Sequence, residues 1–73
     1  MSVEVRAEMA ATVWKVVAAE GDVVGPGDVL VILESMKMEI PVVAETGGTL
    51  RSLPAAEGSL VQEGDVLAVI DEG

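Results

Sequence analysis

One lysine, within the stretch Ser35-Met36-Lys37-Met38, has the clearest chemical potential in this sequence. Its primary amine can accept an activated acyl group if it stands clear of the fold on a rigid support. β-Favouring runs at Val29–Leu33 and Ile40–Val43 flank the stretch, so we expect it to form the turn of a hairpin. Tight hairpin turns favour Gly, Asn or Asp at central positions, where φ is positive. The sequence instead predicts Met36 and Lys37 there, and such backbone strain tends to mark functional sites.

The residues around Lys37 admit two interpretations. From periodicity alone, Lys37 is an ordinary solvated turn lysine beside two partly buried methionines. Alternatively, Met36 and Met38 form an adaptable apolar surface that a partner enzyme grips on either side of the amine. Glu34 and Glu39 flank the motif, and the sequence offers no histidine or cysteine to work with them. We therefore interpret these carboxylates as solvating or enzyme-contacting charges and not as acid or base catalysts.

The elements that must position the lysine are strands. Apolar and polar residues alternate over short segments, Gly-containing turns separate these segments, and no apolar repeat has helical spacing. Many short strands of this kind predict an all-β sandwich or barrel. Pro41 has no amide hydrogen, so its strand should lie at a sheet edge or be bulged there. The strands are expected at Val3–Ala7, Thr12–Ala18, Val29–Leu33, Met38–Ala44, Thr49–Leu53, Leu60–Gln62 and Val66–Ile70.

The sequence also repeats itself. The segment EGDVVGPGDVLVIL from Glu20 matches EGSLVQEGDVLAVI from Glu57 without a gap, at an offset of 37 residues. Neither half can bury its apolar face alone, so we expect two similar β halves packed about a pseudo-twofold axis. The position equivalent to Lys37 falls just past the last residue, Gly73. The lysine hairpin and the C-terminus should therefore lie at opposite ends of the domain.

Composition limits the classes of function. We expect a single domain over residues 1–73 that depends on its apolar core, because the chain has no Cys for disulfides. The net charge of −9 disfavours nucleic acid and anionic membrane surfaces as partners. The first residues do not resemble a signal peptide, and no apolar run approaches the roughly 18 residues that span a bilayer. We expect a cytoplasmic monomer.

The segment Glu34-Ser35-Met36-Lys37-Met38 between two β runs resembles the modification site of the biotinyl and lipoyl attachment domain family. Biotinyl members carry Ala/Ser-Met-Lys-Met, and the chain is most similar to free-standing biotin/lipoyl attachment proteins along essentially its whole length. The resemblance implies a flattened β-barrel of two quasi-symmetric four-stranded antiparallel sheets, with the lysine at an exposed hairpin tip. Two features differ from the family: Glu8–Ala11 replaces a Pro- and Gly-containing stretch, and the chain has no room for a protruding loop.

The resemblance also implies a function. Lys37 would carry covalent biotin, attached by a biotin protein ligase, and a biotin carboxylase and a carboxyltransferase would then use the modified domain. The chain would then be a biotin carboxyl carrier protein and not itself an enzyme. The ligase would recognise the residues that surround the lysine: Glu34, Ser35, Met36, Met38 and Glu39.

Two alternatives remain open from the sequence. The first alternative is a lipoyl carrier, which would carry lipoate alone or in addition to biotin. Lipoyl sites commonly have the sequence Glu-Thr/Ser-Asp-Lys-Ala. Glu34 and Ser35 match this sequence, and the two methionines do not. The second is an unmodified barrel that serves only as an assembly module. Trp14, the only aromatic residue, is expected to be a strand residue packed on the barrel and not an anchor for a partner.

Overall fold

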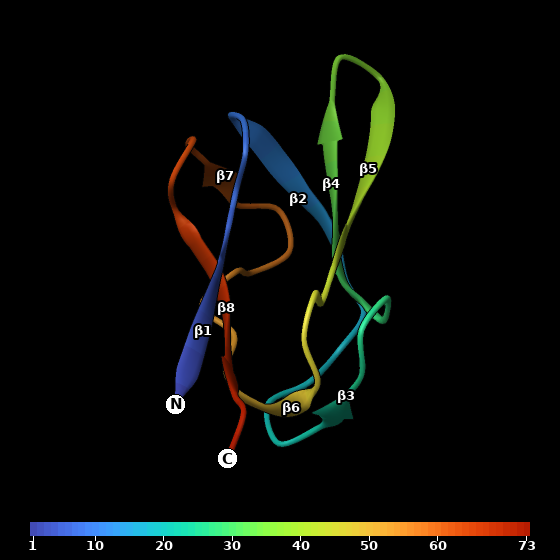
Figure 1. The fold of residues 1–73 in the computed structure, drawn as a ribbon. Coiled ribbons are helices and arrows are strands. Elements are labelled where there is room, and N and C mark those ends of the chain that lie inside the picture. The colour runs from blue at the N-terminus through green and yellow to red at the C-terminus, as the bar shows by residue number, and fades with distance from the viewer.

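The regular secondary structure of the chain consists only of short strands. The computed structural model describes residues 1–73 and has eight strands. Figure 1 shows them wrapped into a flattened barrel with both chain termini at one end. The structure contains no helix that is long and apolar enough to cross a membrane. The strands are β1 (Ser2–Arg6), β2 (Ala11–Val16), β3 (Val23–Val24), β4 (Val29–Ser35), β5 (Met38–Val43), β6 (Gly48–Ser52), β7 (Leu60–Val61) and β8 (Val66–Asp71).

All seven strands predicted from the sequence are present, with ends displaced by a residue or two. The prediction missed β3, which is only two residues long and lies between two turns. Its partner is β6, with Val24 opposite Gly48. Two residues are too few to show the alternation of a strand. The repeat, however, relates β3 to β7, which was predicted, so the internal duplication contained the missing signal.

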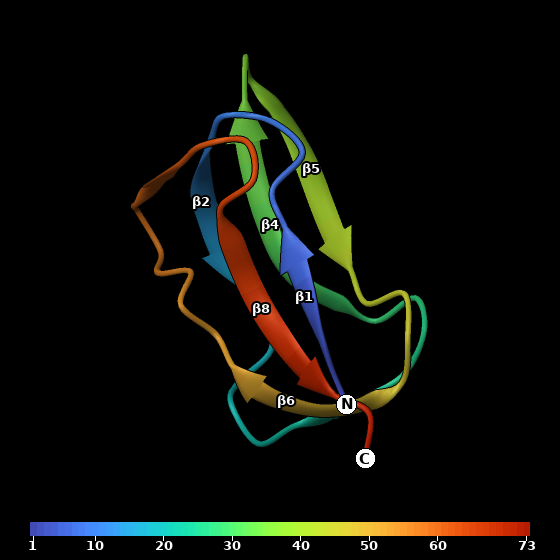
Figure 2. The same ribbon diagram turned by 60° about the vertical axis from the view of Figure 1, so that its left-hand side comes forward.

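The eight strands form two four-stranded antiparallel sheets, as the family resemblance implied. Sheet A has the order β1-β8-β6-β3, and sheet B has the order β5-β4-β2-β7. Figure 2 shows the two sheets facing each other across the barrel. The strand β5 lies at the edge of sheet B, so Pro41 is at an edge as predicted. The fold-class prediction is confirmed.

The pseudo-twofold relation between the halves extends to individual hydrogen bonds. The offset of 37 residues relates β1 to β5, β2 to β6, β3 to β7 and β4 to β8. Exchanging each strand for its counterpart converts the order of sheet A into that of sheet B. The Glu57 carboxylate accepts a hydrogen bond from the backbone N–H of Val16 at 2.9 Å. The equivalent Glu20 carboxylate accepts one from the N–H of Leu53 at 3.1 Å. Each half therefore supplies a carboxylate that holds a strand end of the other half.

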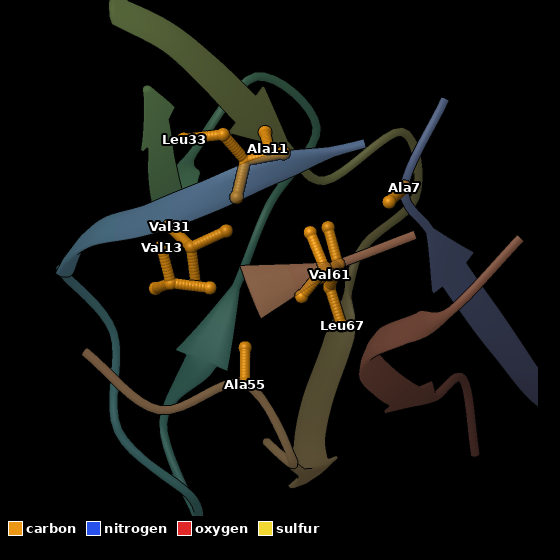
Figure 3. Close-up of a cluster of buried hydrophobic side chains, with 8 residues drawn as sticks. All are labelled: Ala7, Ala11, Val13, Val31, Leu33, Ala55, Val61 and Leu67. Carbon is orange, nitrogen blue, oxygen red and sulfur yellow. The ribbon is translucent and has the colours of Figure 1, made fainter. Parts of the chain in front are cut away.

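The core consists of two apolar clusters that the repeat exchanges. The cluster at the hairpin end contains Leu33 and Leu67, which come from different halves of the chain. In the second cluster their counterparts, Ile70 and Leu30, are fully buried. Figure 3 shows the first cluster, in which the side chains of several strands converge. Its members are Ala7, Ala11, Val13, Val31, Leu33, Ala55, Val61 and Leu67. Because each cluster draws on both halves, neither half is complete alone.

Candidate functional site

The lysine lies at the tip of the hairpin formed by β4 and β5. From Val31 onward the two strands stay in register up to the last pair, Ser35 opposite Met38. Met36 and Lys37 alone connect them, with φ values of 52° and 65°. Positive φ at both central residues is the signature of a type I′ turn, which matches the twist of the flanking strands. The two-residue turn expected from the sequence is therefore present, without the Gly or Asn that would relieve its strain.

The tip projects from the barrel directly above a buried residue of the core. Leu33 is only 2% exposed and lies opposite Val13 of β2. Just beyond it the strands leave the core, and Figure 1 shows the hairpin extending past the other loops at the end away from both termini. The predicted separation of the hairpin and the C-terminus is therefore confirmed. A buried leucine below a two-residue turn leaves the tip little freedom to fold back.

The side chains at the tip are open to solvent. Met36 is 91% exposed and Met38 is 64% exposed. Lys37 is exposed as well, and its amine takes part in no hydrogen bond or salt bridge. The two methionines are therefore not partly buried, as the first interpretation expected. The structure leaves a free amine between two exposed, adaptable apolar side chains, as the second interpretation requires.

Two carboxylates face each other just below the tip. Glu34 and Glu39 are directly opposite in the ladder, and both are exposed. Like charges at such a position destabilise a sheet. No lysine or arginine of the chain forms a salt bridge with either of them. Their mutual repulsion is unrelieved in the free domain, and a basic surface would relieve it.

Relief of the strain in the turn should stabilise the domain. Met36→Asn is expected to raise the free energy of unfolding by about 1 kcal/mol, because Asn adopts positive φ more readily than Met. Chemical denaturation of the two proteins measures the difference. Met38→Asn is the matched control, since Met38 is also exposed but lies within β5 and has no positive φ. Equal stability of parent and Met36→Asn would show that the turn stores no strain.

A groove of about 280 Å³ lies beside the hairpin, between the free edges of β1 and β5. Val5 and Ile40 line it from the two sheets. Pro41 also borders it and has no amide hydrogen to offer to an added strand. The β5 edge is therefore a poor template for pairing with a further strand.

The hairpin brings together every site residue that the sequence predicted: Glu34, Ser35, Met36, Lys37, Met38 and Glu39. The structure differs from the prediction at Trp14. This residue lies in β2 as expected, but its side chain is 48% exposed and belongs to neither core cluster. The repeat carried a signal for this exposure, because its counterpart is the charged Arg51.

Comparisons with known proteins place this chain in the biotin/lipoyl family. A biotin/lipoyl family model, described as "Biotin-requiring enzyme", matches residues 1–70. A "Biotinylated protein TB7.3 homolog" of Mycobacterium leprae is 65% identical over 43 residues, which are 59% of this chain. The match spans 61% of that relative's length.

Solved structures share the fold. The urea carboxylase of Kluyveromyces lactis superposes with a TM-score of 0.91 at 37% identity, over 97% of this chain and 6% of that much longer one. The lipoyl domain of the 2-oxoglutarate dehydrogenase complex of Azotobacter vinelandii superposes with a TM-score of 0.75 at 28% identity. That match covers 88% of this chain and 81% of the lipoyl domain.

Proposed function

The chain belongs to the biotin/lipoyl family of biotin-requiring enzymes, and we propose that it is a biotin carrier modified on Lys37 by a biotin protein ligase. One observation carries the proposal. The Lys37 amine is exposed and unpaired at the tip of a strained two-residue turn, between two exposed methionines. The similarity to a biotinylated protein of Mycobacterium leprae favours biotin as the attached group.

The residues present fit covalent attachment of biotin. An amide with the carboxyl group of biotin needs a primary amine that an enzyme can surround, and the Lys37 side chain has no partner to displace. The ligase would activate biotin as an adenylate. The Lys37 Nζ would then form the new C–N bond and lose a proton, while AMP leaves with the electrons of the broken acyl–oxygen bond. The hairpin contributes position and access and leaves the activation to the ligase.

The neighbours of Lys37 would act as the recognition surface. Met36 and Met38 would be gripped by an apolar surface of the ligase, since both are exposed and flexible. Glu34 and Glu39 would meet basic side chains, which would relieve their mutual repulsion. Ser35, half-buried opposite Met38, would close the ladder below the turn.

After modification, Lys37 would present its cargo to two further enzymes. When attached, biotin supplies a ring nitrogen that carries a carboxyl group, which is chemistry that no side chain of this sequence offers. The swinging lysine arm would visit a biotin carboxylase and then a carboxyltransferase. The close superposition on the carboxylase of Kluyveromyces lactis supports partners of this class. The protein is on this proposal a carrier and not itself a catalyst.

Lipoate is the second candidate cargo, and the match to a lipoyl domain is the observation that favours it. The methionines beside Lys37 favour biotin instead. Intact-mass analysis of protein made in a host with both ligases distinguishes the cargoes, and we expect the mass of one biotin. A lipoyl adduct would replace the proposal by its alternative. Absence of any adduct in a host with both ligases active would favour an unmodified assembly module.

Exchanging the methionines should change the cargo. The double variant Met36→Asp, Met38→Ala recreates the residues that lipoyl sites carry next to the lysine and removes the apolar grip. We expect biotinylation to slow by roughly tenfold or more, as for loss of an interface hot spot, and lipoylation to increase. Parallel assays with purified biotin and lipoate ligases measure both rates. If the double variant is biotinylated as fast as the parent, the methionines are not the discriminating contacts.

A further inference from the structure

The outer face of sheet B carries an apolar patch that lies outside both core clusters. Trp14 is 48% exposed and Leu60 is 76% exposed. The ladder places Leu60 opposite Thr12, and Trp14 follows two residues later on the same face of β2. On the far side of β2, the half-buried Ile32 lies opposite the exposed Pro41. We define Trp14, Ile32, Pro41 and Leu60 as the Trp14 patch; none of them belongs to either core cluster.

The internal repeat provides a control for this patch. The two halves build equivalent sheets, so the positions equivalent to Trp14 and Pro41 perform the same structural task in sheet A. Those positions hold the charged residues Arg51 and Glu4, both exposed. The barrel therefore tolerates charge at these two places. An exposed tryptophan, a residue type enriched at binding hot spots, needs an explanation other than folding.

The hairpin lies at the end of the same sheet, and this continuity indicates the partner. Ile32 is five residues before Lys37, which is about 17 Å along a strand. A standard protein interface covers about 800 Å² on each partner, a disc roughly 30 Å across. The four tip residues alone cannot fill such an area. An enzyme that grips the tip on the outer side would reach the Trp14 patch.

The charges beside the patch indicate which kind of surface the partner presents. Between the patch and the tip lie Glu34 and Glu39, which face each other without a counter-charge. The chain as a whole has a net charge of −9. The surface that fits is therefore apolar where it meets Trp14 and basic where it meets the two glutamates.

We propose that the Trp14 patch is a docking surface for the biotin protein ligase, which binds it with an apolar, basic-rimmed surface while its active site holds Lys37. This inference rests on the proposed function and extends the recognition surface beyond the motif. Docking at a distance from the amine strengthens binding and leaves the chemical step unchanged. Loss of the patch should therefore raise KM and leave kcat nearly constant.

Paired substitutions at equivalent positions of the repeat test the proposal. Trp14→Thr and Leu60→Thr remove the patch with a residue that strands favour. Arg51→Thr and Val23→Thr make the same change at the equivalent positions of sheet A, where Val23 is 82% exposed. Thermal melting of each apo variant verifies the fold. Biotinylation by purified ligase, followed by intact mass at several domain concentrations, gives KM and kcat.

We expect each sheet B variant to raise KM by roughly tenfold or more, with kcat within twofold of the parent and the sheet A variants unchanged. Trp14 is the only aromatic residue, so the domain labelled with 5-fluorotryptophan gives a single ¹⁹F resonance, which should shift or broaden when ligase is added. An unchanged KM for the folded sheet B variants, or equal effects in the two sheets, would overturn the docking surface. A parent domain that takes no biotin would overturn the proposed function, and this inference with it.

Discussion

Replacing Lys37 with arginine is expected to abolish biotinylation and to leave the fold unchanged. Arginine keeps the positive charge and most of the length of the side chain, but its guanidinium does not form the amide that the lysine amine forms. Lys37 is exposed and makes no hydrogen bond or salt bridge, so its replacement removes no contact of the barrel. Streptavidin capture and intact mass should both fall to background, and the melting temperature should stay within a few degrees of the parent.

Lys15→Arg is the matched control for this loss. Lys15 is the only other lysine of the chain, and it is also exposed. It lies within β2, however, opposite Ile32, where the backbone is extended and no methionine is adjacent. We expect this variant to be biotinylated as fully as the parent. Biotin retained by Lys37→Arg, or lost from Lys15→Arg, would show that Lys37 is not the modified residue.

Much of this site was predictable because its signals are local. The two β runs and the lack of Gly at the turn predicted the hairpin and its strain, and the structure has positive φ at Met36 and Lys37. The duplication predicted which end of the barrel the hairpin occupies. These inferences need only neighbouring residues and a constant offset along the chain.

Two features of the domain were not predicted from the sequence: the exposure of Trp14 and the opposition of Glu34 and Glu39. Trp14 lies on the outer face of sheet B, at a bulge in β2 where the pairing with β4 shifts between Val13 and Lys15, and it is part of neither core cluster. The opposition of Glu34 and Glu39 follows from the two-residue turn at Met36 and Lys37, because the length of the turn fixes the register of the ladder. The exposure of Trp14 depends on which elements cover the outer face of sheet B, and the spacing of one strand does not give this. The glutamate pair needed only the length of the turn. A comparison of Trp14 with its counterpart Arg51 would have indicated the first feature.

The second large effect is expected far from the lysine. Gly48 begins β6, and a Cβ built there would lie 2.9 Å from Cγ2 of Ile70 and 3.0 Å from the backbone carbonyl carbon of Asp71. Gly48→Ala therefore forces the β6–β8 ladder apart. Overpacking of this kind costs about 2–3 kcal/mol, a large part of the roughly 3–5 kcal/mol that so small a core supplies. The melting temperature should fall by about 10–20 °C.

Gly47→Ala is the control for this substitution. Its new Cβ would meet its nearest atom, the Val24 carbonyl oxygen, at 3.5 Å, which is an ordinary contact. We expect a change in the free energy of unfolding of less than about 0.5 kcal/mol. Thermal and chemical denaturation of the three proteins measure both effects. Equal stability of Gly48→Ala and Gly47→Ala would mean that the ladder yields without cost.

The same variant tests whether the ligase recognises a folded hairpin or a short motif. Gly48 contacts Asp71 near the C-terminus, at the end of the barrel away from Lys37, so its replacement changes no tip residue. If a folded hairpin is required, biotinylation of Gly48→Ala will equal that of the parent below its melting transition and will fall with the folded fraction above it. A synthetic peptide spanning Val29 to Val43 should then be a poor substrate at every temperature, because an isolated hairpin is marginally stable in water. A peptide modified as efficiently as the domain would show that the motif suffices without the barrel.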